Sequence, residues 1–166
     1  MRELGRSVVR KAELGRKAKM SVYQAVYVPV LTYGHDIWVM TERIRSRLQA
    51  AEMRFLRAVK GVTRSDRIRN THIREEFLME PLLLRVERSQ LKWFGHLIRM
   101  EEERSPEQAF LAKPTGPRPR GRPRKRWADE VRTFCKRLGV TEGELVEVAE
   151  DRQKWREIVG RLIPRP

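Results

Sequence analysis

Residues that build disulfides, metal sites and nucleophilic centres are scarce in this chain of 166 residues. Cys135 is the single cysteine, and the three histidines, His35, His72 and His96, lie far apart in the sequence. One cysteine excludes an internal disulfide, and no spacing typical of zinc ligands occurs. We therefore expect no metal and no cofactor. We expect Cys135 to be a buried or idle thiol rather than a nucleophile.

Long apolar runs are also absent. No stretch approaches the roughly 18 apolar residues that a membrane-spanning helix needs. The first residues carry charges throughout, unlike a signal peptide. These features predict an intracellular protein, nuclear or cytoplasmic, that has no membrane partner.

Catalytic motifs are missing as well. The sequence contains no adjacent aspartates able to hold two Mg²⁺ ions for nucleotidyl transfer. Gly116 and Gly121 are not followed by the Gly-Lys-Ser/Thr ending of a phosphate-binding loop. Local hydrogen bonds to the backbone explain the polar pairs Ser65-Asp66 and His35-Asp36 better than catalysis does. We expect no enzymatic activity from this chain by itself and no small-molecule substrate.

Positive charge is what the sequence has in excess. Lys and Arg number 37 against 22 Asp and Glu, which gives a net charge of +15. A polyanion is the natural partner of such a chain. Residues 141–166 hold six acidic against five basic residues, so the excess lies upstream of them. We expect RNA, DNA or both as partners.

The segment 115–127 concentrates this charge: it reads Thr-Gly-Pro-Arg-Pro-Arg-Gly-Arg-Pro-Arg-Lys-Arg-Trp. Its prolines disfavour helix and favour an extended path, along which side chains alternate. Gly121 would allow a close approach to a groove floor, and narrow A·T-rich minor grooves attract arginines. The core at 119–123 resembles the AT-hook motif of minor-groove DNA binders. A solvated basic linker or a nuclear-import tract is the alternative interpretation. The cations of this basic tract are Arg118, Arg120, Arg122, Arg124, Lys125 and Arg126.

Apolar periodicity predicts an all-α fold. A helix over 1–28 should end or kink at Pro29, and the aromatic segment 31–38 should form a tight, buried corner. A second helix should run from Thr41 to Gly61. Its predicted core stripe is Ile44, Leu48, Ala51, Phe55 and Val59. Its basic stripe, which we interpret as a solvated face more readily than as a binding site, is Arg43, Arg47, Arg54 and Arg57.

A short helix reaching Leu78 and a longer one from Pro81 should follow. The longer helix is predicted to bury Leu83, Val86, Trp93 and Leu97. Its basic stripe, Arg85, Arg88, Lys92, His96 and Arg99, has helical spacing, and we include its arginines and lysine among the candidate nucleic-acid contacts. Two last helices are expected over 126–138, closed by Gly139, and over 142–162, closed by Pro164.

The predicted organisation is thus a small helical bundle over 1–113, a basic Pro/Arg/Gly linker over 114–125 and a C-terminal helical pair over 126–166. Several blocks, taken in order, resemble the C-terminal part of LINE-type (non-LTR) retrotransposon reverse transcriptases. They are residues 14–20 (Leu-Gly-Arg-Lys-Ala-Lys-Met), 28–38 (Val-Pro-Val-Leu-Thr-Tyr-Gly-His-Asp-Ile-Trp), 49–57 (Gln-Ala-Ala-Glu-Met-Arg-Phe-Leu-Arg), 90–100 (Gln-Leu-Lys-Trp-Phe-Gly-His-Leu-Ile-Arg-Met) and 121–127 (Gly-Arg-Pro-Arg-Lys-Arg-Trp).

The resemblance implies thumb-like helices and the segment beyond them, without the palm aspartates that perform reverse transcription. Such a fragment would grip template RNA, primer and target DNA through backbone contacts. Many relatives also carry a cysteine-histidine knuckle or an endonuclease, and this chain shows neither. The alternatives are a docking module for the polymerase palm or fingers, with the basic tract serving nuclear import, and an inert remnant of a decayed element.

Overall fold

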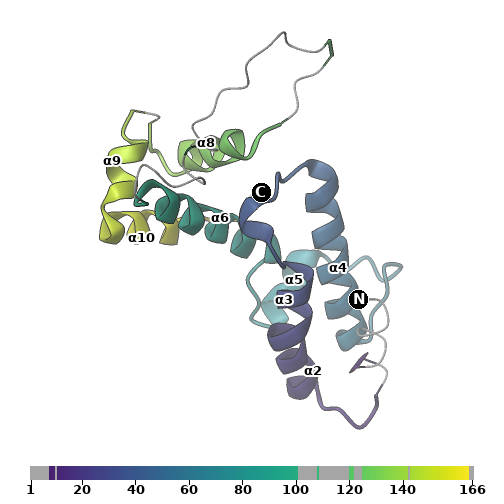
Figure 1. Ribbon diagram of the computed structural model, residues 1–166. Coiled ribbons are helices and arrows are strands. Elements are labelled where there is room, and N and C mark those ends of the chain that lie inside the picture. The colour runs from purple at the N-terminus through teal and green to yellow at the C-terminus, as the bar shows by residue number, and fades with distance from the viewer. Residues whose placement is uncertain are drawn as a thin grey trace. The chain divides into compact units, whose positions relative to one another are not determined.

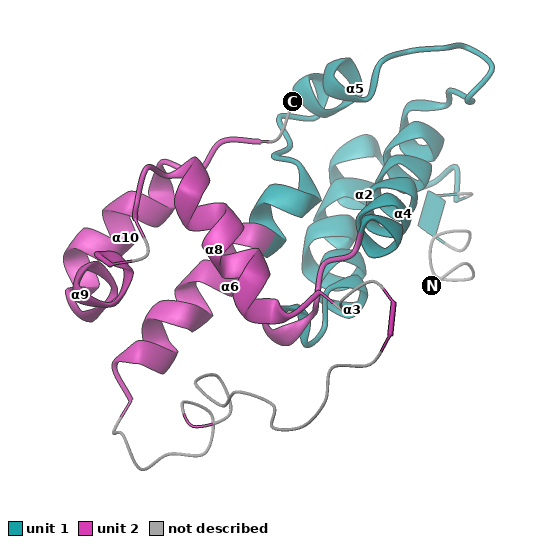
Figure 2. Cartoon of the chain, turned by 90° about the horizontal axis from the view of Figure 1, so that it is seen from above, with its two compact units in different colours: residues 1–35, 42–86 teal, residues 36–41, 87–166 magenta. Residues whose placement is uncertain are grey.

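The structure, a computed structural model, describes residues 8–9, 11–100, 108, 120–121, 125–141 and 143–164. These residues form helices and turns and no strand, which confirms the all-α class (Figure 1). The chain divides into two compact units. Unit 1 comprises residues 1–35 and 42–86, and unit 2 comprises residues 36–41 and 87–166 (Figure 2). Most of the predicted linker lies outside the described residues, so its boundaries stay a prediction.

One helix of unit 1 changes its winding along its length. α2 (Arg16–Val22) continues into a π-helical turn (Tyr23–Tyr27) and then into α3 (Val28–Leu31). The predicted end at Pro29 is wrong, because this proline lies in the first turn of α3. Proline lacks an N–H and crowds the preceding turn. The wider π-helical turn directly before Pro29 accommodates it, with the Val28 N–H bonded to the Tyr23 carbonyl.

The core of unit 1 is aromatic at its centre. The ring of Phe55 lies 4.9 Å from that of Tyr23 and 4.8 Å from that of Tyr27, measured between centroids. Phe55 belongs to α4 (Glu42–Lys60), and α5 (Asn70–Glu76) follows it. Burial removes the Tyr23 hydroxyl from water and raises its pKa. The other buried apolar residues of unit 1 are Val28, Leu48, Met53, Leu56, Ile73, Leu82, Leu84 and Val86.

The buried face of α4 differs from the predicted stripe. Leu48 and Phe55 are buried as predicted, whereas Ile44, Ala51 and Val59 are half-exposed. In their place α4 buries Arg45, Glu52, Met53 and Leu56. Apolar periodicity assigns charged residues to the outside, so it misplaces a helix face that buries two of them. The predicted end of α4 is confirmed: Gly61 has φ +80°, and the Val62 N–H bonds to the Arg57 carbonyl at 3.0 Å.

The segment 31–38 is a turn, but two of its large side chains face solvent. Tyr33 is 86% exposed and Ile37 is 67% exposed. The chain reverses through local bonds instead: Gly34 has φ +67°, and the Thr32 hydroxyl donates to the Val28 carbonyl at 2.8 Å. The prediction of a buried corner is therefore wrong, since hydrogen bonds within the turn make the bend without burying these side chains.

α6 (Leu82–Ile98) contributes its first turn to unit 1 and the remainder to unit 2. Phe94 lies at the centre of the unit 2 core, with its ring 5.6 Å from that of Trp155 and 6.5 Å from that of Trp127. The Trp155 indole donates to the Leu91 carbonyl at 2.8 Å. Of the residues predicted to be buried on α6, Val86 and Leu97 are buried, whereas Leu83 and Trp93 are half-exposed.

The described residues from 125 to 160 form three helices of unit 2. α8 (Trp127–Arg137) is followed by Gly139 at φ +75°, which confirms the predicted stop. The predicted single helix over 142–162 is wrong, because two helices are present, α9 (Leu145–Glu150) and α10 (Arg152–Gly160). Asp151 separates them. Its carboxylate accepts the backbone N–H groups of Gln153 and Lys154 at 2.9 and 3.0 Å, so it caps α10.

Candidate nucleic-acid interface

The basic tract is described only in part. Arg118, Arg122 and Arg124 lie outside the described residues. Arg120 and Gly121 are exposed, and Gly121 has φ +109°, a conformation that side-chain-bearing residues rarely adopt. Arg126 is exposed as well, and its backbone N–H donates to the Asp129 carboxylate at 2.9 Å in the first turn of α8.

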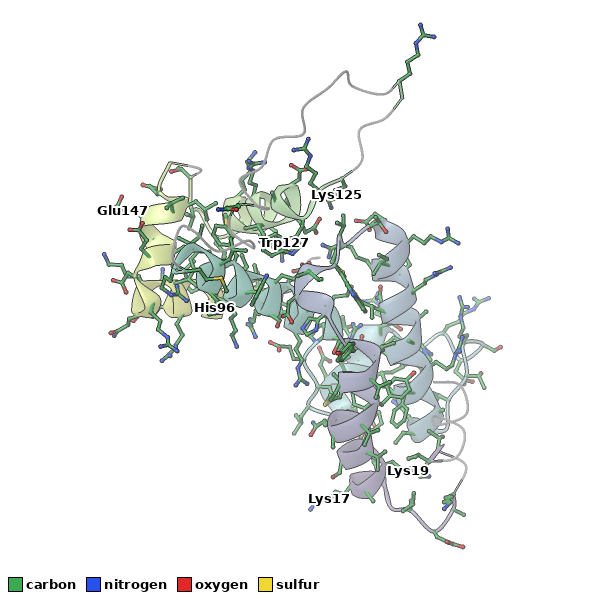
Figure 3. The ribbon with its side chains drawn as sticks, viewed as in Figure 1. Lys17, Lys19, His96, Lys125, Trp127 and Glu147 are labelled. Atoms are coloured by element: carbon green, nitrogen blue, oxygen red, sulfur yellow. The ribbon has the colours of Figure 1, made fainter. Side chains whose placement is uncertain are left out.

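Lys125 has a structural role that its sequence context did not reveal. Its ammonium pairs with the carboxylate of Glu130, whose side chain is completely buried, and donates to the Met40 carbonyl at 3.4 Å. Figure 3 shows Lys125 and Trp127 at the start of α8. Because a buried carboxylate without a partner is costly, this pair fixes the end of the tract to α8. Lys125 is therefore an anchor for the tract more than a contact for a ligand.

Two arginines of the α6 stripe also hold the fold together. Arg88 donates to the Leu162 and Gly160 carbonyls at 2.8 and 3.4 Å. Arg99 donates to the Ala149 carbonyl, and its burial, followed by the charge of Arg152, lowers its pKa. These carbonyls lie near the ends of α9 and α10, where backbone oxygens lack helical partners. Arg88 and Arg99 thus brace unit 2.

The rest of the α6 stripe faces solvent. Arg85, Lys92 and His96 are exposed, and the side chains of Arg85 and Lys92 form no hydrogen bond or ion pair within the described part of the chain. The His96 ring lies 5.4 Å from that of the half-exposed Trp93. Arg85, Lys92, Arg120 and Arg126 are therefore the described candidate residues whose side-chain charges remain available.

Some basic residues outside the candidate set are neutralised. Glu76 accepts from Arg16 at 2.7 Å and also pairs with Lys60. Hydrogen bonds from Lys60 and Arg16 hold the pKa of the Glu76 carboxyl below its usual value. The Arg16 guanidinium in addition lies 4.3 Å above the Phe77 ring. These cations are occupied by the fold.

Sequence reasoning missed a basic concavity on unit 1. It has a volume of about 580 Å³ and lies between α4 and the segment that follows it. Arg54, Arg57 and Arg64 line it, and no carboxylate of the described residues does. Arg54 and Arg57 belong to the stripe that we interpreted as a solvated face. The spacing of the arginines gave no signal for a concavity, because the returning segment 62–70 creates it.

Other kinds of site are not found in the described ranges. No cluster of three or more His, Cys, Asp or Glu residues able to hold a metal ion occurs there. None of the helices described there is long and apolar enough to cross a membrane. Cys135 is buried, and burial raises its pKa to about 12, so its thiol is protonated at neutral pH.

The chain is similar to an uncharacterized transposon-derived protein of Caenorhabditis elegans. The two sequences are 25% identical over 156 residues, which cover 88% of this chain and 55% of that protein. The chain thus spans about half the length of this relative. No family model matches the chain, and no solved structure matches it.

Proposed function

We propose that this chain is a nucleic-acid-binding part of a transposon-derived reverse transcriptase and that it has no polymerase activity of its own. The observation that carries the proposal is a set of exposed cations that have no carboxylate partner among the described residues: Arg85, Lys92, Arg120 and Arg126. The net charge of +15 supports it. So does the similarity to a transposon-derived protein.

The chemistry of such cations is contact with phosphates. Each phosphate neutralised by an arginine or lysine releases counterions, so affinity falls as salt rises. The basic tract supplies Arg118, Arg120, Arg122 and Arg124 in addition to Arg126. With about five phosphates neutralised, log K should fall against log salt with a slope of about −4.5 on duplex DNA.

The test is a salt titration of the purified chain against matched A·T-rich DNA, G·C-rich DNA and structured RNA duplexes. Steep salt dependence supports phosphate contact, and a slope near zero contradicts it. Preference for the A·T-rich duplex over the G·C-rich duplex supports minor-groove insertion of the arginines. Equal binding of the two DNA duplexes indicates contact with phosphates without insertion of arginines into the minor groove.

A second candidate function is docking onto a partner protein, and one observation favours it. Val30 and Tyr33 of unit 1 are 56% and 86% exposed, although both are apolar or aromatic. In this alternative the partner is the palm or fingers of the polymerase, and the basic tract serves nuclear import. Removal of the tract's arginines separates the two functions. It abolishes salt-steep binding in the first and leaves nucleic-acid affinity nearly unchanged in the second.

A further inference from the structure

The concavity on unit 1 has a wall held by one arginine. α4 ends at Gly61, and the chain then returns along the helix. The Arg57 guanidinium donates to the Thr63 carbonyl and to the Asn70 side-chain oxygen, each at 3.0 Å, and also to the Ile68 carbonyl. Three acceptors on the returning segment are thus tied to one side chain of α4. The wall is therefore part of the fold.

A second set of bonds shapes the rim. The Asp66 carboxylate accepts from the backbone N–H and the hydroxyl of Thr63, at 2.6 and 2.9 Å. These bonds lower the pKa of Asp66, so it is ionised at neutral pH. Asp66 does not line the concavity, whereas Thr63 does. The one acidic residue of the returning segment is thus engaged in closing the turn.

The charge that lines the concavity is positive only. Arg54 and Arg64 line it and are exposed, and their guanidinium groups form no hydrogen bond or ion pair among the residues that the structure describes. Arginine presents planar donors that suit phosphate oxygens. Two guanidinium groups at one concave surface, without a carboxylate, favour an anion there.

The remaining lining is mixed in a way that suits a nucleobase. Small and apolar side chains can pack against the face of a base, and amide and hydroxyl groups can bond to base edges. The volume of about 580 Å³ lies in the range of small-molecule sites. The lining residues other than arginines are Ser46, Gln49, Ala50, Met53, Ala58, Val62, Thr63 and Asn70.

We propose that this concavity seats one nucleotide of a single-stranded nucleic acid. Arg54 and Arg64 hold a phosphate, and the base lies against Ala50, Ala58 and Val62. This proposal rests on the proposed nucleic-acid binding, but it places a contact on unit 1 rather than on the basic tract. A single strand is the ligand because its unstacked bases can enter a concave site, whereas bases in a duplex stay stacked.

The test measures binding of the full chain to fluorescently labelled octamers of uridine RNA and thymidine DNA. The double variant Arg54→Gln, Arg64→Gln should weaken binding about tenfold and reduce the salt slope by about 0.7, since the two arginines hold one phosphate and each phosphate contact on a single strand contributes about 0.7. The matched control is Lys17→Gln, Lys19→Gln on α2 (Figure 3), which removes the same charge from unit 1 outside the concavity. The control should change affinity less than twofold. An equal loss in both variants contradicts the proposal.

A steric variant separates the site from general charge. Ala50 is exposed and lines the concavity, so Ala50→Trp fills it without changing charge. This variant should weaken octamer binding about tenfold, and unchanged binding overturns the proposal. Circular dichroism verifies the fold, and Ser46→Trp, also exposed in the lining, replaces Ala50→Trp where folding fails.

Competition identifies the ligand chemistry. Uridine monophosphate should displace the octamer at lower concentration than inorganic phosphate, because the base adds contacts. Equal potency of the two competitors overturns the proposed nucleotide site.

Comparison of the two octamers identifies the source of the ligand. Binding of either octamer supports the proposal, and the octamer that binds more tightly shows whether the strand is RNA or DNA. If Ala50→Trp binds the octamers as tightly as the unaltered chain does, the nucleotide site in the concavity is refuted. If the same variant still binds duplexes with steep salt dependence, the proposed function remains supported. Absence of duplex binding by the unaltered chain refutes the proposed function separately.

Discussion

Arg74 forms a two-bonded ion pair with Glu52 inside unit 1. The Arg74 Nη2 donates to Glu52 Oε2 at 2.7 Å, and Nε donates to Oε1 at 3.3 Å. The Leu82 backbone N–H donates to the same Oε1 at 3.0 Å. Glu52 is fully buried, and Arg74 is 9% exposed. One carboxylate of α4 therefore binds α5 and the start of α6.

The first prediction concerns this pair. Glu52→Ala leaves the Arg74 guanidinium buried without its partner and the Leu82 N–H without its acceptor. We expect the free energy of unfolding to fall by about 3 kcal/mol or more, measured by urea titration. Glu75→Ala on α5 is the control, because Glu75 is exposed, and its effect should stay within about 0.5 kcal/mol. Equal stability of the two variants would show that the pair contributes nothing.

The second prediction concerns close packing in unit 2. A Cβ atom at Gly95 would overlap the Trp155 indole, whereas a Cβ at Gly160 would meet nothing within 4 Å. Gly95→Ala should therefore lower the free energy of unfolding by about 1–3 kcal/mol. Gly160→Ala should raise it by about 0.5 kcal/mol, because alanine favours helix. Thermal unfolding of both variants checks the opposite signs, and a stabilised Gly95→Ala would contradict the packing.

The third prediction uses the pH dependence of stability. Hydrogen bonds from the Lys154 and Gln153 N–H groups hold the pKa of Asp151 below its ordinary value of 3.8. A depressed folded-state pKa contributes stability above that ordinary value, and this stability is lost as pH falls through the folded pKa. Asp151→Asn removes the charge, so stability should depend less on pH below about 4.

Melting temperatures measured from about pH 2 to about pH 7 report this effect, because that range spans the titration of carboxyl groups. Glu147→Gln is the matched control, since Glu147 is exposed on α9 (Figure 3). Its melting profile should follow that of the unaltered chain. If Glu147→Gln and Asp151→Asn gave the same profile, the cap would have no role.

The fourth prediction separates bracing from binding on α6. Arg99→Gln removes the donor to the Ala149 carbonyl, so it should lower the melting temperature and leave the duplex salt slope unchanged. Lys92→Gln removes an exposed charge, so it should reduce the slope by about 0.9 and leave the melting temperature unchanged. A reduced salt slope in Arg99→Gln together with a lowered melting temperature in Lys92→Gln would contradict both assignments.

Local chemistry made part of this fold predictable. Gly61 and Gly139 end helices because each adopts a positive φ, and the stops of α4 and α8 followed from that property. Arg85 and Lys92 are exposed, as the helical spacing of the basic stripe predicts. These features depend on a few neighbouring residues, which the sequence displays directly.

Long-range contacts made the rest unpredictable. The buried face of α4 depends on Glu52, whose partner Arg74 is 22 positions away. The bracing roles of Arg88 and Arg99 depend on carbonyls that lie 74 and 50 positions further along the chain. The concavity depends on the bonds of Arg57 to the returning segment. Asp151 is different, because its capping bonds join neighbouring residues and aspartate is a favoured N-cap residue.

The central claim is that the basic tract contacts phosphates. The most direct test replaces Arg118, Arg120, Arg122 and Arg124 by glutamine and measures the salt dependence of duplex binding. Lys125 and Arg126 are retained, because the Lys125–Glu130 pair and the Arg126 N–H hold the start of α8. Lost contact with four phosphates should flatten the slope by about 3.6. An unchanged slope would contradict the claim and place the binding elsewhere on the chain.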